Sequence, residues 1–149
     1  MKDVTIDYIL RATWQAVARM YNEEAKEFDS TMAVGFTLLS IDPRTGTPST
    51  ALGPKMGMEA TSLSRILKSM EEKGLIERKP NPNDGRGVLI HLTDFGVEKR
   101  NYSKEVVLQF DDAVKKNVSE EKLNHFVEVM NTINNLISEK KIYNKATTN

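Results

Sequence analysis

The stretch from residue 52 to residue 96, LGPKMGMEATSLSRILKSMEEKGLIERKPNPNDGRGVLIHLTDFG, decides the fold of this chain. It begins with two short segments whose apolar residues recur at helical spacing, and Gly57 separates them. A small residue late in one helix lets a second helix approach, and a glycine between them accepts the positive φ of a tight turn. Gly53 and Gly57 therefore predict a helix-turn-helix, with helices over about 48–55 and about 59–73.

The second of these helices has two different faces. Its inner apolar stripe is Leu63, Ile66, Leu67 and Met70. The buried residues expected to fix the crossing of the two helices are Leu52, Met56, Met58, Leu63 and Ile66. The outward residues are Thr61, Ser62, Ser64, Arg65, Lys68 and Ser69, with no carboxylate between Ala60 and Met70. Short hydroxyls allow close approach to a duplex, while arginine can chelate a guanine edge and lysine can pair with a phosphate. The alternative is an ordinary solvated helix face, which has a similar composition.

The rest of the stretch predicts a β-hairpin that follows the second helix. Gly74 supplies a left-handed end to that helix, and strands are expected over 75–79 and 88–92. Pro80 and Pro82 remove backbone donors from the first limb, which discourages pairing at its edge. Asn83, Asp84 and Gly85 have turn chemistry, with Gly85 and Gly87 free to adopt positive φ.

Arg86 is expected near the tip of this hairpin. There it could enter a minor groove or hold a phosphate, and Asp84 could pair with its guanidinium. The alternative is a plain surface hairpin with an exposed salt bridge, which contributes little free energy.

The flanking segments predict long helices. Apolar residues recur at helical steps over about 5–28, and a second helix is expected over about 31–42. Thr47 is interpreted as a helix N-cap before Pro48, Thr93 as the cap of a helix to about 116, and Ser119 as the cap of a last helix. The stripe of that last helix is Leu123, Phe126, Met130, Ile133 and Ile137, and residues 143–149 are expected to be frayed.

The order of these elements predicts a mostly α fold with a small β-hairpin wing (α+β), a winged helix-turn-helix held between long terminal helices. We divide the chain into N-terminal helices (1–43), a winged helix-turn-helix region (44–93) and C-terminal helices (94–149). Pro54 lies inside the first helix of the helix-turn-helix, where it should remove a hydrogen bond and shorten or kink that helix. We call the winged helix-turn-helix region, residues 44–93, the reading unit.

Composition bounds the kinds of protein this chain can be. The net charge is zero, but residues 44–100 hold ten Lys and Arg against seven Asp and Glu. There is no cysteine, which excludes disulfides and thiol redox sensing. No apolar run is long enough to cross a membrane, and the start has acids where a signal peptide needs an apolar core. We therefore expect a cytoplasmic protein without a membrane partner.

The region from Leu52 to Gly96 resembles the MarR family of bacterial transcriptional regulators. The matching pieces are SLSRILKSMEEKGLIER and the wing pattern met by Asp84, Arg86, Leu92 and Thr93. The resemblance implies a homodimeric repressor whose terminal helices interlock two subunits on a pseudo-palindrome of double-stranded DNA. It places Ser62, Ser64, Arg65 and Lys68 in the major groove and Arg86 in the minor groove. Gly87 stands where many relatives have a second basic residue.

In the resembled family, effectors bind between the terminal helices and the reading unit. Side chains that could line such a pocket are Trp14, Met20, Tyr21, Met32 and Phe36. The alternative is that they only pack the core and the dimer. The family precedent for an effector is a small aromatic acid or an acyl thioester, and the sequence does not choose between them.

Sites of other kinds are not indicated. His91 is expected to face solvent or the neighbouring wing, and His125 to lie at a surface or interface. No spacing supplies a metal site, no glycine-rich phosphate loop follows a strand, and no catalytic constellation supports an enzyme. We therefore expect no cofactor. The competing hypothesis is a winged-helix module that binds protein rather than DNA.

Overall fold

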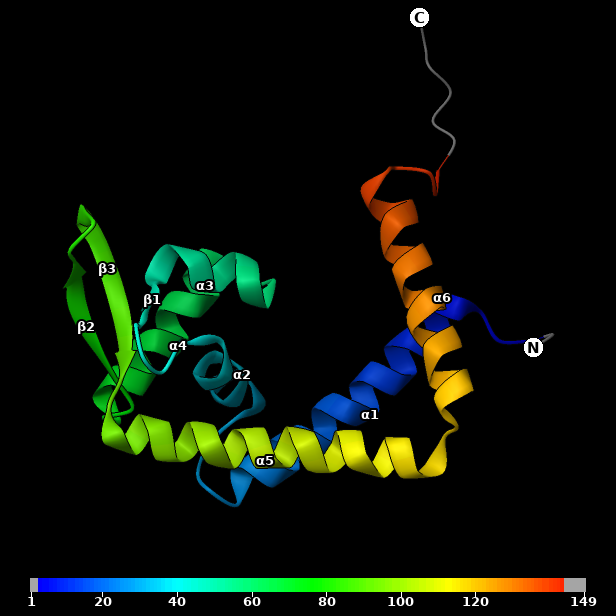
Figure 1. Cartoon of the computed structure of the whole chain (residues 1–149), viewed down its shortest axis with the longest axis horizontal. Coiled ribbons are helices and arrows are strands. Elements are labelled where there is room, and N and C mark those ends of the chain that lie inside the picture. The colour runs from blue at the N-terminus through cyan, green and yellow to red at the C-terminus, as the bar shows by residue number, and fades with distance from the viewer. Residues whose placement is uncertain (1–2, 144–149) are drawn as a thin grey trace, which may run out of the picture. The chain divides into compact units, whose positions relative to one another are not determined.

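The computed structural model describes residues 3–143, which form two compact units divided between Val107 and Leu108. Figure 1 shows the first unit as a group of helices beside a small sheet. The predicted fold class is confirmed, because the described residues contain six helices and one three-stranded antiparallel sheet.

The first two helices each begin directly after a capping threonine. α1 spans Ile6–Lys26, and the hydroxyl of Thr5 accepts a hydrogen bond from the backbone N of Tyr8. α2 spans Met32–Ser40, and Thr31 caps it in the same way. A side-chain acceptor at this position satisfies an amide that the first turn would otherwise leave unpaired.

The helix-turn-helix consists of α3 (Ser49–Met56) and α4 (Ala60–Glu72). Pro54 is expected to shorten or kink the first of these helices, but it does not end it, since α3 continues past Pro54 to Met56. Pro54 lacks the donor that would reach the carbonyl of Thr50, but Thr50 is exposed, so water can pair with that carbonyl.

The sheet has the order β1-β3-β2, from β1 (Thr47–Pro48), β2 (Ile76–Asn81) and β3 (Asp84–Leu92). The interpretation of Thr47 as a helix cap is wrong. Thr47 pairs with Ile90 in the sheet, and its hydroxyl accepts a hydrogen bond from the backbone N of Asp42. Pro48 is the residue that precedes α3, without a side-chain cap.

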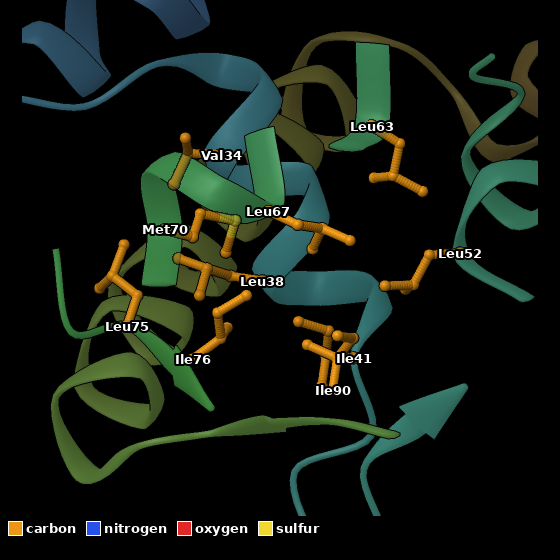
Figure 2. Close-up of a cluster of buried hydrophobic side chains, with 10 residues drawn as sticks. All are labelled: Val34, Leu38, Ile41, Leu52, Leu63, Leu67, Met70, Leu75, Ile76 and Ile90. Atoms are coloured by element: carbon orange, nitrogen blue, oxygen red, sulfur yellow. The ribbon is translucent and has the colours of Figure 1, made fainter. Parts of the chain in front are cut away.

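One apolar core holds the reading unit together (Figure 2). It joins side chains from α2, α3, α4 and the sheet: Val34, Leu38, Ile41, Leu52, Leu63, Leu67, Met70, Leu75, Ile76 and Ile90. Burying one such side chain stabilises the fold by about 1.5–3 kcal/mol. The core therefore fixes the buried face of α4 and turns the opposite face to solvent.

The C-terminal helices also follow their predicted caps. α5 spans Asp94–Asn117, and the hydroxyl of Thr93 accepts from the backbone N of Gly96. α6 spans Glu120–Ser138 and is capped by Ser119. α6 has no fully buried residue. Of the predicted frayed tail, only Tyr143 lies within the described residues.

Candidate nucleic-acid interface

The turn between α3 and α4 sets the crossing of these helices. Gly57 has φ +63° and ends α3 in the left-handed conformation, as its position predicts. The backbone N of Met58 donates to the carbonyl of Gly53 at 2.9 Å. A Cβ on Gly53 would lie 3.1 Å from the carbonyl oxygen of Met58. The close approach expected at Gly53 is therefore present, and a Cβ there would be tighter than most Cβ contacts, which favours glycine.

The outer face of α4 carries the predicted hydroxyl and basic residues. Thr61, Ser62, Ser64, Arg65 and Lys68 are all exposed. Leu63, Leu67 and Met70 are buried on the opposite side and Ile66 is half-buried, as the apolar stripe predicts. The exposed face thus combines hydrogen-bond donors with two positive charges, which suits a phosphate backbone and base edges.

The tip of the wing differs from the prediction. Asn81 pairs with Asp84, so the turn consists of Pro82 and Asn83, and the Asn81 carboxamide oxygen accepts from the backbone N of Asn83 at 3.0 Å. The pairing register shifts between Pro80 and Asn81, which leaves residues 85–87 in an irregularity of β3. The described glycines with positive φ are Gly46, Gly57 and Gly74, so Gly85 and Gly87 do not use the positive φ that is open to them. The position of the turn is set by the pairing of β2 with β3. That pairing depends on contacts across the hairpin and not only on the residues of the turn.

Asp84 acts on Arg86 through the backbone. Its carboxylate accepts a hydrogen bond from the backbone N of Arg86 at 3.0 Å. Among the ion pairs within residues 3–143, none joins the Asp84 carboxylate to the Arg86 guanidinium, which corrects the predicted pairing. The carboxylate therefore shapes the irregular segment that presents Arg86, whose side chain is exposed.

The other basic residues of the wing are in ion pairs. Arg78 Nε lies 3.1 Å from Glu71 Oε2, which links β2 to the last turn of α4. Lys79 Nζ lies 3.7 Å from Glu77 Oε2. Both pairs are half-exposed and contribute little free energy. Of the three Lys and Arg residues in the wing, residues 75–92, Arg86 is the one outside these pairs.

A cavity of about 370 Å³ lies within the first unit, beside α2. Of the five residues named for an effector pocket, Tyr21, Met32 and Phe36 line this cavity. Trp14 and Met20 do not line it and are 53% and 38% exposed. Trp14 shares the helix face of Tyr21 but lies about two turns away along α1.

Several residues of this cavity are missing from the sequence prediction. They are on α5 and in the segments after α1 and α4: Phe28, Lys73, Leu75, Phe95, Lys99 and Tyr102. Lys99 Nζ lies 5.5 Å from the ring centroid of Phe28 and 5.3 Å from that of Phe95. The steps of four and three residues from Phe95 to Lys99 and Tyr102 put these side chains on one face of α5. That spacing is the sequence signal from which these cavity residues of α5 could have been predicted.

The phenol of Tyr102 has a raised pKa. Burial is the main cause, and the carboxylates of Glu24, Glu27 and Glu105 add to it. Burial and negative neighbours both disfavour the phenolate. Tyr102 also packs on Phe28, with 4.0 Å between the ring centroids. The cavity therefore presents a neutral hydroxyl at this position.

The histidines do not form a site. His91 is half-buried, and a Cβ on Gly46 would lie 2.8 Å from its ring. It therefore packs on the loop before β1 rather than facing solvent, whereas His125 is exposed. Within residues 3–143, no group of three His, Cys, Asp or Glu side chains could hold a metal ion. No helix in this part of the chain is both long and apolar enough to cross a membrane.

A helix-turn-helix followed by a β-hairpin places the chain in the winged helix-turn-helix class. The model of the MarR family matches residues 31–88, which contain α2, the helix-turn-helix and most of the wing. Over this region the chain is similar to the MarR family.

Individual relatives agree with this assignment. The uncharacterized HTH-type transcriptional regulator YdgJ of Bacillus subtilis is 34% identical over 89 residues, which is 57% of this chain and 54% of YdgJ. The chain thus spans about half the length of that relative. The HTH-type transcriptional regulator SarZ of Staphylococcus saprophyticus is 28% identical over 135 residues, covering 85% of this chain and 92% of SarZ.

The fold is also similar to that of a family member solved with DNA. The crystal structure of a mutant MarR from E. coli complexed with operator DNA matches with a TM-score of 0.76 and 26% identity. The match covers 86% of this chain and 92% of that chain.

Proposed function

We propose that this protein is a transcriptional repressor that binds a pseudo-palindromic DNA operator as a homodimer and responds to a small ligand. The observation that carries the proposal is the exposed face of α4 over residues 61–68, which has no carboxylate, together with the exposed Arg86 of the wing. Its support is the similarity to a MarR mutant complexed with operator DNA. Residues 44–93 form the DNA-binding region in this proposal, and the helices of 1–43 and 94–149 provide dimerisation.

Recognition is proposed to divide between α4 and the wing. Arg65 binds a guanine edge in the major groove, because its guanidinium matches the two acceptors of that base. Lys68 and the hydroxyls of Ser62 and Ser64 bind phosphates, which position the helix without reading sequence. Arg86 enters the minor groove, where the negative potential attracts a cation.

Exposed apolar side chains support the homodimer. In the first unit, Ile6, Tyr8 and Trp14 of α1 are 48–56% exposed. In the second, Phe126 and Ile137 of α6 are 57% and 59% exposed, on the apolar stripe that the sequence predicts. Exposed apolar residues that recur along one helix face, as on α6, are typical of an interaction surface. A homodimer with two recognition helices would place them about 34 Å apart to reach successive major grooves.

The cavity beside α2 supports the ligand response. It is mostly apolar with a few polar groups, as small-molecule sites are. Lys73 and Leu75 line it directly after α4, so a bound molecule contacts the segment that follows the recognition helix. An aromatic acid or the acyl part of a thioester is the proposed effector class. A ligand alters DNA affinity only if it binds the two states of the protein differently.

Two substitutions on α4 test the reading face. Arg65→Ala should cost about 1–3 kcal/mol and relax discrimination at one base pair, whereas Lys68→Ala should weaken all duplexes alike. Lys104→Ala is the control, because Lys104 is exposed on α5, outside the proposed face. The measurement is fluorescence anisotropy with a duplex that the parent protein selects from a random pool. The assignment of the face fails if both α4 variants bind as the control does.

A second candidate is a winged-helix module that binds protein. The observation in its favour is that Arg78 and Lys79 of the wing are already neutralised by ion pairs. This candidate predicts no duplex binding even at about 50 mM salt, where electrostatic attraction to DNA is strong. Selection of a duplex by the parent protein excludes it.

A further inference from the structure

The chain leaves the recognition helix and enters α5 at one shared point. Gly74 follows α4 with φ +74°, and the backbone N of Leu75 donates to the carbonyl of Met70 at 2.9 Å. The hydroxyl of Thr93, directly before α5, donates to the carbonyl of Gly74 at 2.6 Å. The same hydroxyl accepts from the backbone N of Gly96 at 3.0 Å. One side chain therefore joins the end of α4 to the start of α5.

Backbone contacts reinforce this junction. The backbone N of Thr93 donates to the carbonyl of Leu75 at 3.1 Å. Gly96 is buried, and a Cβ at its position would lie 2.0 Å from that same carbonyl oxygen. The first turn of α5 therefore rests directly on the backbone that follows α4, at a distance that only glycine allows. We call the contacts of Thr93 and Gly96 with residues 74 and 75 the α4–α5 clasp.

Ordinary helix caps in this chain are local. The hydroxyls of Thr5, Thr31 and Ser119 each accept one backbone hydrogen bond within the first turn of their own helix. Thr93 does the same and also donates to a residue 19 positions earlier. A hydroxyl has one proton to donate and lone pairs to accept, so both bonds can form together. The donated bond is not needed for capping, and it acts on the recognition helix.

We propose that Thr93 and Gly96 are positioning residues for DNA recognition, which fix the direction of α4 relative to α5 through the clasp. The proposal rests on the proposed function of α4. Bidentate reading of a base needs side chains held within about 0.5 Å and about 10–20° of the productive geometry. The core fixes the buried face of α4, and the clasp fixes its C-terminal end. Loss of the clasp should therefore reduce selectivity for the operator more than it reduces attraction to DNA in general.

Substitutions at position 93 separate capping from positioning. Thr93→Val removes both hydrogen bonds at nearly constant shape, and Thr93→Ser keeps both. Thr93→Asp keeps a good capping acceptor but cannot donate to the carbonyl of Gly74 when ionised. Thr5→Val is the matched control, because it removes a local cap of α1 only. Urea unfolding shows that each variant is folded before binding is measured.

The readout is the ratio of the affinities for a duplex selected by the parent protein and for a scrambled duplex. Thr93→Val and Thr93→Asp should lower this ratio by about tenfold, the effect of one to two hydrogen bonds, while the serine variant and the Thr5→Val control keep it. Should the valine variant not fold, the aspartate variant decides. The proposal is overturned if a folded aspartate or valine variant keeps the parent ratio, or if Thr5→Val lowers it equally. If the parent protein selects no duplex, the proposed function itself falls and the positioning claim with it.

Discussion

Gly96 should be the glycine of this chain that tolerates alanine least. The substitution Gly96→Ala places a Cβ 2.0 Å from the carbonyl oxygen of Leu75 and 3.0 Å from its carbonyl carbon. Both atoms belong to the backbone, so no side chain can rotate away. The Leu75 oxygen is also held by the backbone N of Thr93 at 3.1 Å.

The size of the effect follows from these distances. An ordinary contact begins at 3.4 Å, so the carbonyl must move by about 1.4 Å, which breaks its hydrogen bond to Thr93. Overpacking costs about 1–3 kcal/mol and the lost hydrogen bond about 1 kcal/mol. Alanine offsets about 1 kcal/mol of this, because it is a better helix former than glycine. The expected net loss is roughly 1–3 kcal/mol in the free energy of unfolding.

Two other glycines provide matched comparisons. A Cβ at Gly85 or Gly57 meets nothing within 4 Å, but Gly57 has φ +63°. Gly85→Ala should therefore change stability by less than about 0.5 kcal/mol. Gly57→Ala should cost about 1–2 kcal/mol, through the left-handed backbone alone. Gly96→Ala thus tests steric contact, Gly57→Ala tests backbone conformation, and Gly85→Ala is the control that changes neither.

The assay is urea unfolding followed by far-UV circular dichroism, at one fixed protomer concentration because subunit association would contribute to stability. The expected order of midpoints is parent and Gly85→Ala highest, Gly57→Ala lower and Gly96→Ala lowest. If Gly96→Ala unfolds within about 0.5 kcal/mol of Gly85→Ala, the close approach of α5 to Leu75 is wrong.

Three further predictions address the wing, the second unit and the cavity. Arg86→Ala should weaken binding to a selected duplex by about tenfold and lower the salt dependence of binding. Arg78→Ala removes a charge that is already paired, so its effect should be smaller. Fluorescence anisotropy over a salt series measures the affinity and its salt dependence for both variants. Phe126→Asp should dissociate the proposed homodimer, because it places a charge on the exposed apolar stripe of α6. Asn124→Asp is the control and should leave the dimer intact. Sedimentation equilibrium that shows dimers for both variants would contradict the assignment of α6 to the dimer interface. Tyr102, whose pKa is raised, should ionise above the usual tyrosine range near about 10 in an ultraviolet titration. Its neutral form is favoured by folding, so this stabilisation is present below about pH 10 and is lost as pH rises through the folded pKa; Tyr102→Phe should make the alkaline loss of stability smaller.

Local chemistry in the sequence determined most of the secondary structure. Thr5, Thr31 and Ser119 cap their helices because a hydroxyl meets an amide three residues away. Gly57 and Gly74 have positive φ where the helices must end. The outer face of α4 is exposed because the apolar stripe on its other side is buried. Each of these features depends on residues within one or two helical turns, so the linear pattern contains the cause.

Tertiary structure decided the features that depend on distant residues. Thr47 belongs to the sheet because Ile90, 43 positions away, pairs with it. The register of β2 on β3 moved the wing turn to Pro82 and Asn83, and Asp84 binds the backbone of Arg86 rather than its guanidinium. The cavity takes residues from α1, α2 and α5 together, which excluded Trp14 and Met20 and included Lys99. The hydroxyl of Thr93 reaches Gly74 for the same reason. Such contacts form only when separate elements pack on the shared core, so the sequence determined the parts and packing determined which of them meet.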